Sequence, residues 1–124
     1  MYVNWSRPKV TDWTEEQVAS RLATDNDWLE RALVMLYQRQ TEVERNINET
    51  LDSNQCGFQR ADVLRFSVLA RKIQNGGHLS DTEIAYTRRP WKRSRVPQPT
   101  ICKYRRQILD MIESRAKARM EMVQ

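Results

Sequence analysis

Residues 27–47 read DWLERALVMLYQRQTEVERNI, and their pattern decides the fold class. Apolar side chains recur there at intervals of three and four residues, with charged side chains between them, which is typical of a helix with one buried face. We therefore predict a long amphipathic helix that forms the spine of the core. Its predicted apolar face consists of Trp28, Leu29, Ala32, Leu33, Leu36, Tyr37, Val43 and Ile47.

Two capping-box signatures predict the starts of shorter helices. Thr14 is followed three residues later by Gln17, and Ser80 is followed three residues later by Glu83. In each pair the first side chain accepts a hydrogen bond from the backbone of the second, whose side chain reaches back. The first helix is short, and the second has about ten residues before Pro90 removes an amide donor and ends it.

Helical periodicity also predicts a helix over residues 60–74 and another from about Thr100 to the end of the chain. The first of these stops at Gly76 and Gly77, which favour the left-handed conformation of a helix C-cap. Tyr104 has the spacing of a core residue. The predicted core residues are Val63, Leu64, Ser67, Val68, Ala70 and Ile73 in the former helix, and Ile101, Tyr104, Ile108, Met111 and Ile112 in the latter.

The predicted fold is therefore all-α, a small bundle of four to five helices in a single domain over residues 1–124. Residues 1–13 are expected to form an extended arm, and residues 90–99 a basic, proline-rich crossover loop before the last helix. The composition, 40% apolar and 30% charged residues, is that of a soluble globular protein. With no apolar run of membrane-spanning length and no secretory signal, we expect no membrane association and a cytoplasmic location, the host cytoplasm for a phage protein.

Residue types with catalytic or metal-binding chemistry are sparse. Cys56 and Cys102 are the only cysteines and His78 is the only histidine, and they are isolated from one another in the sequence. Two cysteines are too few for a disulfide framework, and no spacing typical of a zinc site is present. We predict no metal, no cofactor and no enzymatic activity, and we interpret His78 as a loop residue.

The positive charge is concentrated in residues 84–109. This segment contains eight basic and no acidic side chains, whereas residues 1–83 contain ten basic and thirteen acidic ones. A local excess of this kind attracts polyanions. The predicted nucleic-acid-binding residues are Arg88, Arg89, Trp91, Lys92, Arg93, Arg95, Lys103, Arg105 and Arg106.

Two interpretations of this segment remain open at the level of sequence. In the first, the cations neutralise backbone phosphates and Trp91 stacks on exposed bases. In the second, the segment is a solvated loop, and Trp91 anchors it on the core.

Several short motifs also carry a resemblance to a known family. They are NQCGF (54–58), Asp62, Ser67, Ala70, LSDTE (79–83), Arg88 and KYRRQIL (103–109), preceded by LERALVMLYQRQTEVE (29–44). In this order, over residues 13–109, they resemble a module of small proteins from phages and mobile bacterial elements, also found as an accessory segment of helicase-like proteins. Its motifs read N-G-x-G-F, D-A, L-T-x-x-Q and K-Y-x-x-Q-L.

The chain departs from that pattern at Gln55, where the family has glycine, at Glu83, where it has glutamine, and at residues 90–99, which look like an insertion. The resemblance implies a helical module, encoded by a phage or mobile element, that works around nucleic acid.

We therefore expect a nucleic-acid-binding module that holds DNA or RNA through residues 84–109. The alternative is a phage-type inhibitor or adaptor whose basic loop docks in an acidic groove of a host or anti-phage defence complex. Whether the C-terminal helix also pairs two copies of the chain stays open.

Overall fold

The computed structural model describes residues 11–47, 58–59 and 61–123, without the side chains of 41–47 and 122–123. Within these residues the fold is all-α, as predicted, and the only pairing of strand type is an isolated bridge between Pro90 and Pro99. The elements are α1 (Glu15–Thr24), α2 (Asn26–Ile47), α3 (Val63–Gln74), α4 (Asp81–Thr87), the 3-10 helix η1 (Thr100–Tyr104) and α5 (Arg105–Val123).

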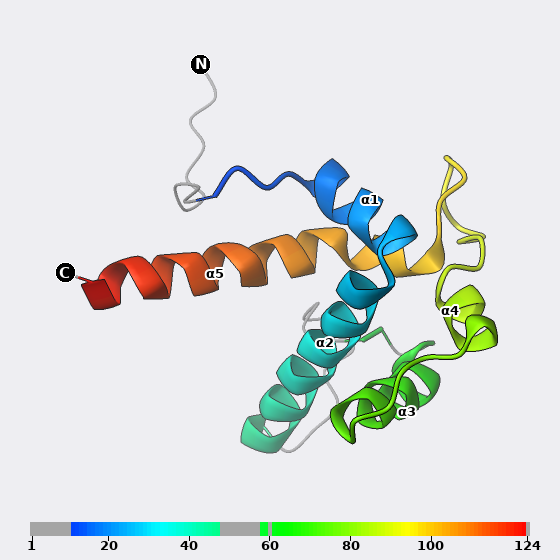
Figure 1. The fold of residues 1–124 in the computed structure, drawn as a ribbon, viewed down its shortest axis with the longest axis horizontal. Coiled ribbons are helices and arrows are strands. Elements are labelled where there is room, and N and C mark those ends of the chain that lie inside the picture. The colour runs from blue at the N-terminus through cyan, green and yellow to red at the C-terminus, as the bar shows by residue number, and fades with distance from the viewer. Residues whose placement is uncertain (1–10, 48–57, 60, 124) are drawn as a thin grey trace.

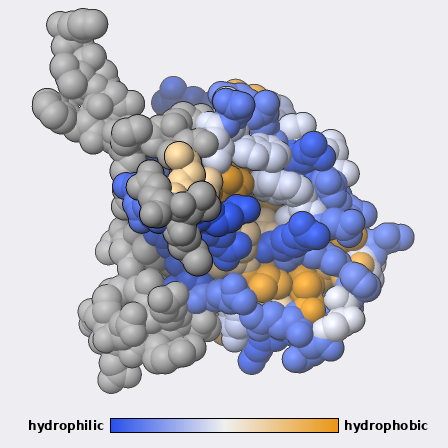
Figure 2. Space-filling model, turned by 60° about the vertical axis from the view of Figure 1, so that its left-hand side comes forward, coloured by the Kyte–Doolittle hydropathy of each residue, from blue (hydrophilic) through white to orange (hydrophobic). Residues whose placement is uncertain are grey.

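Helices α2 and α5 are the two long elements, and they cross each other (Figure 1). α1 packs against both of them, and α3 packs against α2. The C-terminal end of α5 extends away from the other helices (Figure 1). No helix in the described part of the chain is long and apolar enough to cross a membrane. On the face shown in Figure 2, hydrophilic side chains cover most of the described surface, and apolar ones form small separate areas.

Both predicted capping boxes are present, and a single aspartate joins the first two helices. The Thr14 side chain accepts from the Gln17 amide at 3.2 Å, and the Gln17 side chain accepts from the Thr14 amide at 3.1 Å. Asp25 then ends α1, since its amide donates to Arg21 O. Its carboxylate accepts from the Trp28 amide at 3.1 Å and so satisfies a free donor at the start of α2. One residue thus serves both helix ends, which explains the short connection.

The core follows the predicted face of α2. Leu29, Ala32, Leu33 and Leu36 are at most 1% exposed, and Trp28 and Tyr37 pack against the core from its edge. Val43 and Ile47 were also predicted to face the core, but their side chains lie outside the described residues. From α5 and η1 the core receives Ile101, Tyr104, Ile108 and Met111.

The predicted core face of α3 was correct only in part. Ala70 is buried, and Val63 and Ile73 pack against the core from its edge. Leu64 is 81% exposed and Val68 is 55% exposed, whereas Phe66 and Leu69 are buried. Phe66 lies at the centre of an aromatic group, with ring centroids 5.4 Å from Phe58, 6.0 Å from Tyr86 and 6.4 Å from Tyr104. These contacts come from distant parts of the chain and fix how α3 is rotated. Aromatic pairs at such distances add stability beyond the area they bury.

Two of the predicted helix ends moved as well. α3 begins at Val63 and not at residue 60, and it ends where expected, with Gly76 at a φ of 92° just beyond it. α4 ends at Thr87, earlier than the predicted ten residues. Because a residue before proline is driven out of the helical region, Arg89 cannot extend α4 toward Pro90. The sequence also predicts a turn with a positive φ at Gly57, which lies outside the described residues.

Candidate nucleic-acid interface

The chain between α4 and η1 folds back on itself as a short hairpin. Pro90 and Pro99 lie opposite each other in the antiparallel bridge, and the Trp91 amide donates to Gln98 O at 2.9 Å. The Thr100 amide closes the base by donating to Arg89 O at 2.8 Å. We call residues 90–99 the basic hairpin; it protrudes from the bundle above α4 and η1 (Figure 1).

The two prolines occupy the one kind of paired position that tolerates them. In an antiparallel pair, residues of a non-hydrogen-bonded pair direct their backbone N–H and C=O groups away from the partner strand. The hydrogen bonds around Pro90 and Pro99 come from the residues that follow them, Trp91 and Thr100, which is the pattern of such a pair. The missing amide protons therefore remove no bond from the hairpin. The sequence predicted a basic, proline-rich crossover loop here but not that its two ends would pair.

Ser94 organises the tip of the basic hairpin. Its amide donates to Trp91 O at 3.1 Å, its hydroxyl donates to Val96 O at 2.7 Å, and it accepts from the Gln98 side chain at 2.6 Å. Three hydrogen bonds centred on this one residue, two of its side chain and one of its backbone, hold the turn in shape. The cationic side chains on either side of Ser94 are consequently presented from a defined loop.

The nine residues predicted to bind nucleic acid fall into three groups. The exposed ones are Lys92, Arg93, Arg95 and Arg106. Trp91 and Arg105 are half-buried. Arg88, Arg89 and Lys103 have partners within the fold and hold the base of the hairpin in place.

Lys103 and Arg89 converge on one buried carboxylate. Asp62, which precedes α3, is 1% exposed, and its Oδ2 lies 2.6 Å from Lys103 Nζ. The Tyr104 hydroxyl donates to the same oxygen and itself accepts from the Gln59 amide at 2.9 Å. Arg89 Nη2 lies 3.6 Å from Asp62 Oδ1, which accepts no hydrogen bond from the part of the chain that the structure describes. The Lys103 side chain is only 7% exposed, so its charge is already neutralised inside the protein.

The Asp62 carboxylate also changes the chemistry of its neighbour. Burial, together with the hydrogen bond to Asp62, raises the pKa of Tyr104, so the phenol stays protonated and acts as a donor. The predicted core position of Tyr104 is confirmed. Sequence reasoning did not identify Asp62 as an ionic centre, because its partners lie about forty residues away in the chain.

Arg88 and Arg89 fasten the hairpin to the helices. Arg88 Nε donates to Leu22 O at 2.9 Å, and its Nη1 donates to Asn26 Oδ1 at 2.8 Å. Burial lowers the pKa of Arg88, and its Nη2 has no hydrogen-bond partner within the described residues. Arg89 lies over the Tyr86 ring at 4.1 Å and donates to Tyr86 O at 2.8 Å. Both arginines thus serve the fold, with Arg88 spanning α4 and the α1–α2 junction.

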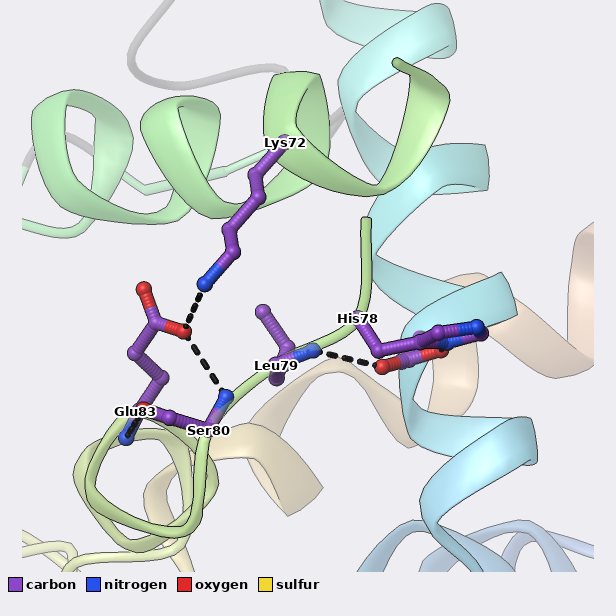
Figure 3. Close-up of polar contacts among 6 residues, drawn as sticks. Lys72, His78, Leu79, Ser80 and Glu83 are labelled. Atoms are coloured by element: carbon purple, nitrogen blue, oxygen red, sulfur yellow. Dashed lines mark hydrogen bonds and ion pairs between the residues drawn. The ribbon is translucent and has the colours of Figure 1, made fainter. Parts of the chain in front are cut away.

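His78 lies in a second polar cluster, on the connection between α3 and α4. Its Nδ1 is 3.0 Å from Glu30 Oε1, and the Leu79 amide donates to Glu30 Oε2 at 2.8 Å. Figure 3 shows the neighbouring contacts, in which Glu83 accepts from Lys72 at 2.7 Å and from the Ser80 amide at 2.8 Å. Glu30 raises the pKa of His78 through a hydrogen bond and its negative charge. These contacts position the start of α4.

The described residues contain no group of three or more histidine, cysteine, aspartate or glutamate side chains that could hold a metal ion. Cys102 is buried, and burial raises the pKa of its thiol. Cys56 lies outside the described residues. Comparison of the chain with protein families, with curated proteins and with solved structures found no match.

Proposed function

We propose that this protein is a non-enzymatic nucleic-acid-binding module of phage or mobile-element origin, and that the basic hairpin holds backbone phosphates. One observation supports the proposal above the others. Lys92, Arg93 and Arg95 are exposed on a hydrogen-bonded turn, and none of them forms an ion pair with the described residues. Unpaired cations of this kind gain affinity by releasing the counterions of a phosphate backbone.

The proposed interface is narrower than the sequence predicted. Arg88, Arg89 and Lys103 position the hairpin, while Lys92, Arg93 and Arg95 bind phosphates. Arg106, exposed in the first turn of α5, adds a further positive charge. Trp91 is half-buried at the base of the turn, so one part of its ring packs on the protein while another part remains available to stack on a base.

Fluorescence anisotropy with labelled single-stranded DNA, duplex DNA and RNA tests the proposal. We expect micromolar or tighter binding that weakens steeply between about 50 and 200 mM salt, since each phosphate contact adds to the slope of log K against log salt. Changing Arg93 and Arg95 together to Gln should reduce that slope by about 2 and weaken binding to all sequences alike. Changing Arg115 and Arg119 together to Gln removes the same charge from α5 and serves as the control. Absence of binding at low salt excludes the proposal.

A second candidate is a protein-binding inhibitor or adaptor whose basic hairpin docks in an acidic groove of a nucleic-acid-processing complex. The observation that favours it is Val96, which is 67% exposed beside Arg95. An exposed apolar side chain gains nothing from phosphate contact but can be buried by a protein partner. Changing Val96 to Ser should leave nucleic-acid affinity unchanged within twofold under the first candidate, whereas capture of a host complex should fall under the second.

A further inference from the structure

Helices α2 and α5 form a groove that the basic hairpin does not share. It encloses about 220 Å³, and its apolar lining includes Trp28 and Met35 from α2 and Ile108 and Ile112 from α5. A larger depression of about 600 Å³ adjoins it and shares Arg31, Met35 and Arg115 with it. Trp28, Met35 and Ile112 are each only partly buried by the fold, so part of their apolar surface remains uncovered within the described structure.

Three arginines border this groove. Arg31 of α2 and Arg115 and Arg119 of α5 line it, and all three are exposed. None of them makes an ion pair or hydrogen bond with the described residues. Arg115 and Arg119 are four residues apart on one helix face, where like charges repel each other and destabilise the helix. Fold stability therefore does not account for their placement.

No acidic side chain is among the residues that line the groove. On α5, positions 108, 112, 115 and 119 recur at intervals of three and four residues and share one face, whereas Asp110 and Glu121 fall on the opposite face. Glu30, in the adjoining depression, accepts from the Leu79 amide and pairs with His78. Asp27 also lines that depression. The lining of the groove itself thus combines apolar side chains with three positive charges and no negative one.

We infer that this groove is a docking site for an acidic amphipathic helix of a partner protein. Apolar side chains at intervals of three and four residues would cover Met35 and Ile112, and glutamates or aspartates beside them would pair with Arg31, Arg115 and Arg119. Arginine and tryptophan are the side chains most often found at energetically dominant positions of such interfaces. Methionine adapts its shape to the incoming residue.

Two other occupants fit the groove less well. A nucleic acid would satisfy the arginines but leave the uncovered apolar surface of Met35 and Ile112 without a partner. A second copy of the chain that presented the same face of α5 would bring Arg115 and Arg119 against their own counterparts, because a two-fold interface pairs like with like. The charge distribution therefore selects an acidic partner.

The test uses the full chain and a fluorescein-labelled synthetic peptide of about 18 residues, or five helical turns, with leucines on one face and glutamates on the flanks. A second peptide has the same composition with its leucines spread around the helix, and a third has every glutamate replaced by lysine. We expect the first peptide to bind with a dissociation constant of tens of micromolar or less, and each of the others to bind at least tenfold more weakly.

Variants locate the binding site. Changing Arg115 and Arg119 together to Glu should lower the affinity for the acidic peptide at least tenfold and raise the affinity for the lysine peptide. Changing Arg93 and Arg95 together to Glu should alter both affinities by less than twofold. All four arginines are exposed, so these substitutions leave the core unchanged. Circular dichroism verifies the fold of each variant. Equal binding of the acidic and spread peptides, no binding of either, or an unchanged affinity in the α5 variant would each overturn the inference. An Arg115, Arg119 double variant that loses its affinity for DNA but keeps its affinity for the acidic peptide would also overturn the inference.

Discussion

Asp62 shows how much of the fold can depend on a single side chain. A carboxylate that is 1% exposed would be strongly unfavourable alone, and it is compensated here by Lys103, by the Tyr104 hydroxyl and by the more distant Arg89. Through these contacts the start of α3, the end of α4 and η1 are tied together. The same contacts bury the Lys103 side chain and engage Arg89, two of the cations that were predicted to bind nucleic acid.

Removing the charge of Lys103 alone should destabilise the fold more than removing the charges of Asp62 and Lys103 together. We expect Lys103→Met to lower the free energy of unfolding by about 3 kcal/mol, because the Asp62 charge loses its closest compensating partner. The double variant Asp62→Asn, Lys103→Met should lose less than the sum of the two single variants. Urea unfolding of the four proteins measures the coupling. Additive effects would show that the two charges do not depend on each other.

His78 provides a pH-dependent contact that can be followed without interference, since it is the only histidine. Glu30 raises the pKa of His78 above its unfolded value of 6.5. The contribution of the pair to stability is therefore complete below that value and is lost as pH rises through the folded pKa. NMR titration of the imidazole should show a pKa above 6.5 in the native protein and a lower one in Glu30→Gln. Identical titration curves for the two proteins would exclude the Glu30 contact.

At the scale of elements, local signals in the sequence were sufficient to predict where α1 and α4 begin. Both capping boxes lie within four residues of chain, and both are confirmed. The rotation of α3 could not be predicted in the same way. Its apolar residues allow more than one buried face, and the choice is made by Phe58, Tyr86 and Tyr104, which meet Phe66 only after the chain has folded.

Two leucines on α3 test this rotation with one chemical change. Leu69→Ala removes a buried side chain and should lower the free energy of unfolding by about 2 to 5 kcal/mol. Leu64→Ala removes an exposed one and should change it by no more than about 0.5 kcal/mol. Thermal or urea unfolding of the two variants decides between the observed and the predicted face. The reverse order of effects would restore the face first predicted from the sequence.

The cap of α1 gives a smaller and more local effect. Thr14→Ala removes the acceptor for the Gln17 amide, so we expect a loss of about 1 kcal/mol in the free energy of unfolding. Thr14→Asn, which retains a side-chain acceptor, should recover most of the loss. Urea midpoints of these variants measure the cap, and equal midpoints for all three proteins would mean that the capping box adds nothing.

For the whole molecule, the charges divide into those that build the fold and those that remain free. Sequence reasoning identified residues 90–99 as a basic, proline-containing loop but could not separate Arg88, Arg89 and Lys103 from Lys92, Arg93 and Arg95. The separation depends on groups such as Asp62 and Leu22 O, which only the folded chain brings near. Figure 1 shows the hairpin toward one end of the longest axis and the C-terminal end of α5 at the other.

The basic hairpin and the α2–α5 groove share no residue, so they should be occupied independently. We expect a labelled oligonucleotide to bind the chain with the same affinity, within twofold, when the α2–α5 groove is saturated with the acidic peptide. A competition titration by anisotropy, with the Arg115, Arg119 double variant as the control, measures the coupling. Displacement of the oligonucleotide by the peptide in the unmodified protein would place both ligands on one surface.

The opposed prolines of the basic hairpin have one more consequence. Residues in a pair of this type direct their backbone groups outward, and Pro90 and Pro99 have no amide proton to direct there. The outer margins of the hairpin therefore lack donors at the positions where a foreign strand would begin to add itself. At high protein concentration, edge-to-edge strand pairing between copies of the basic hairpin is therefore disfavoured, and the cations of the hairpin stay accessible.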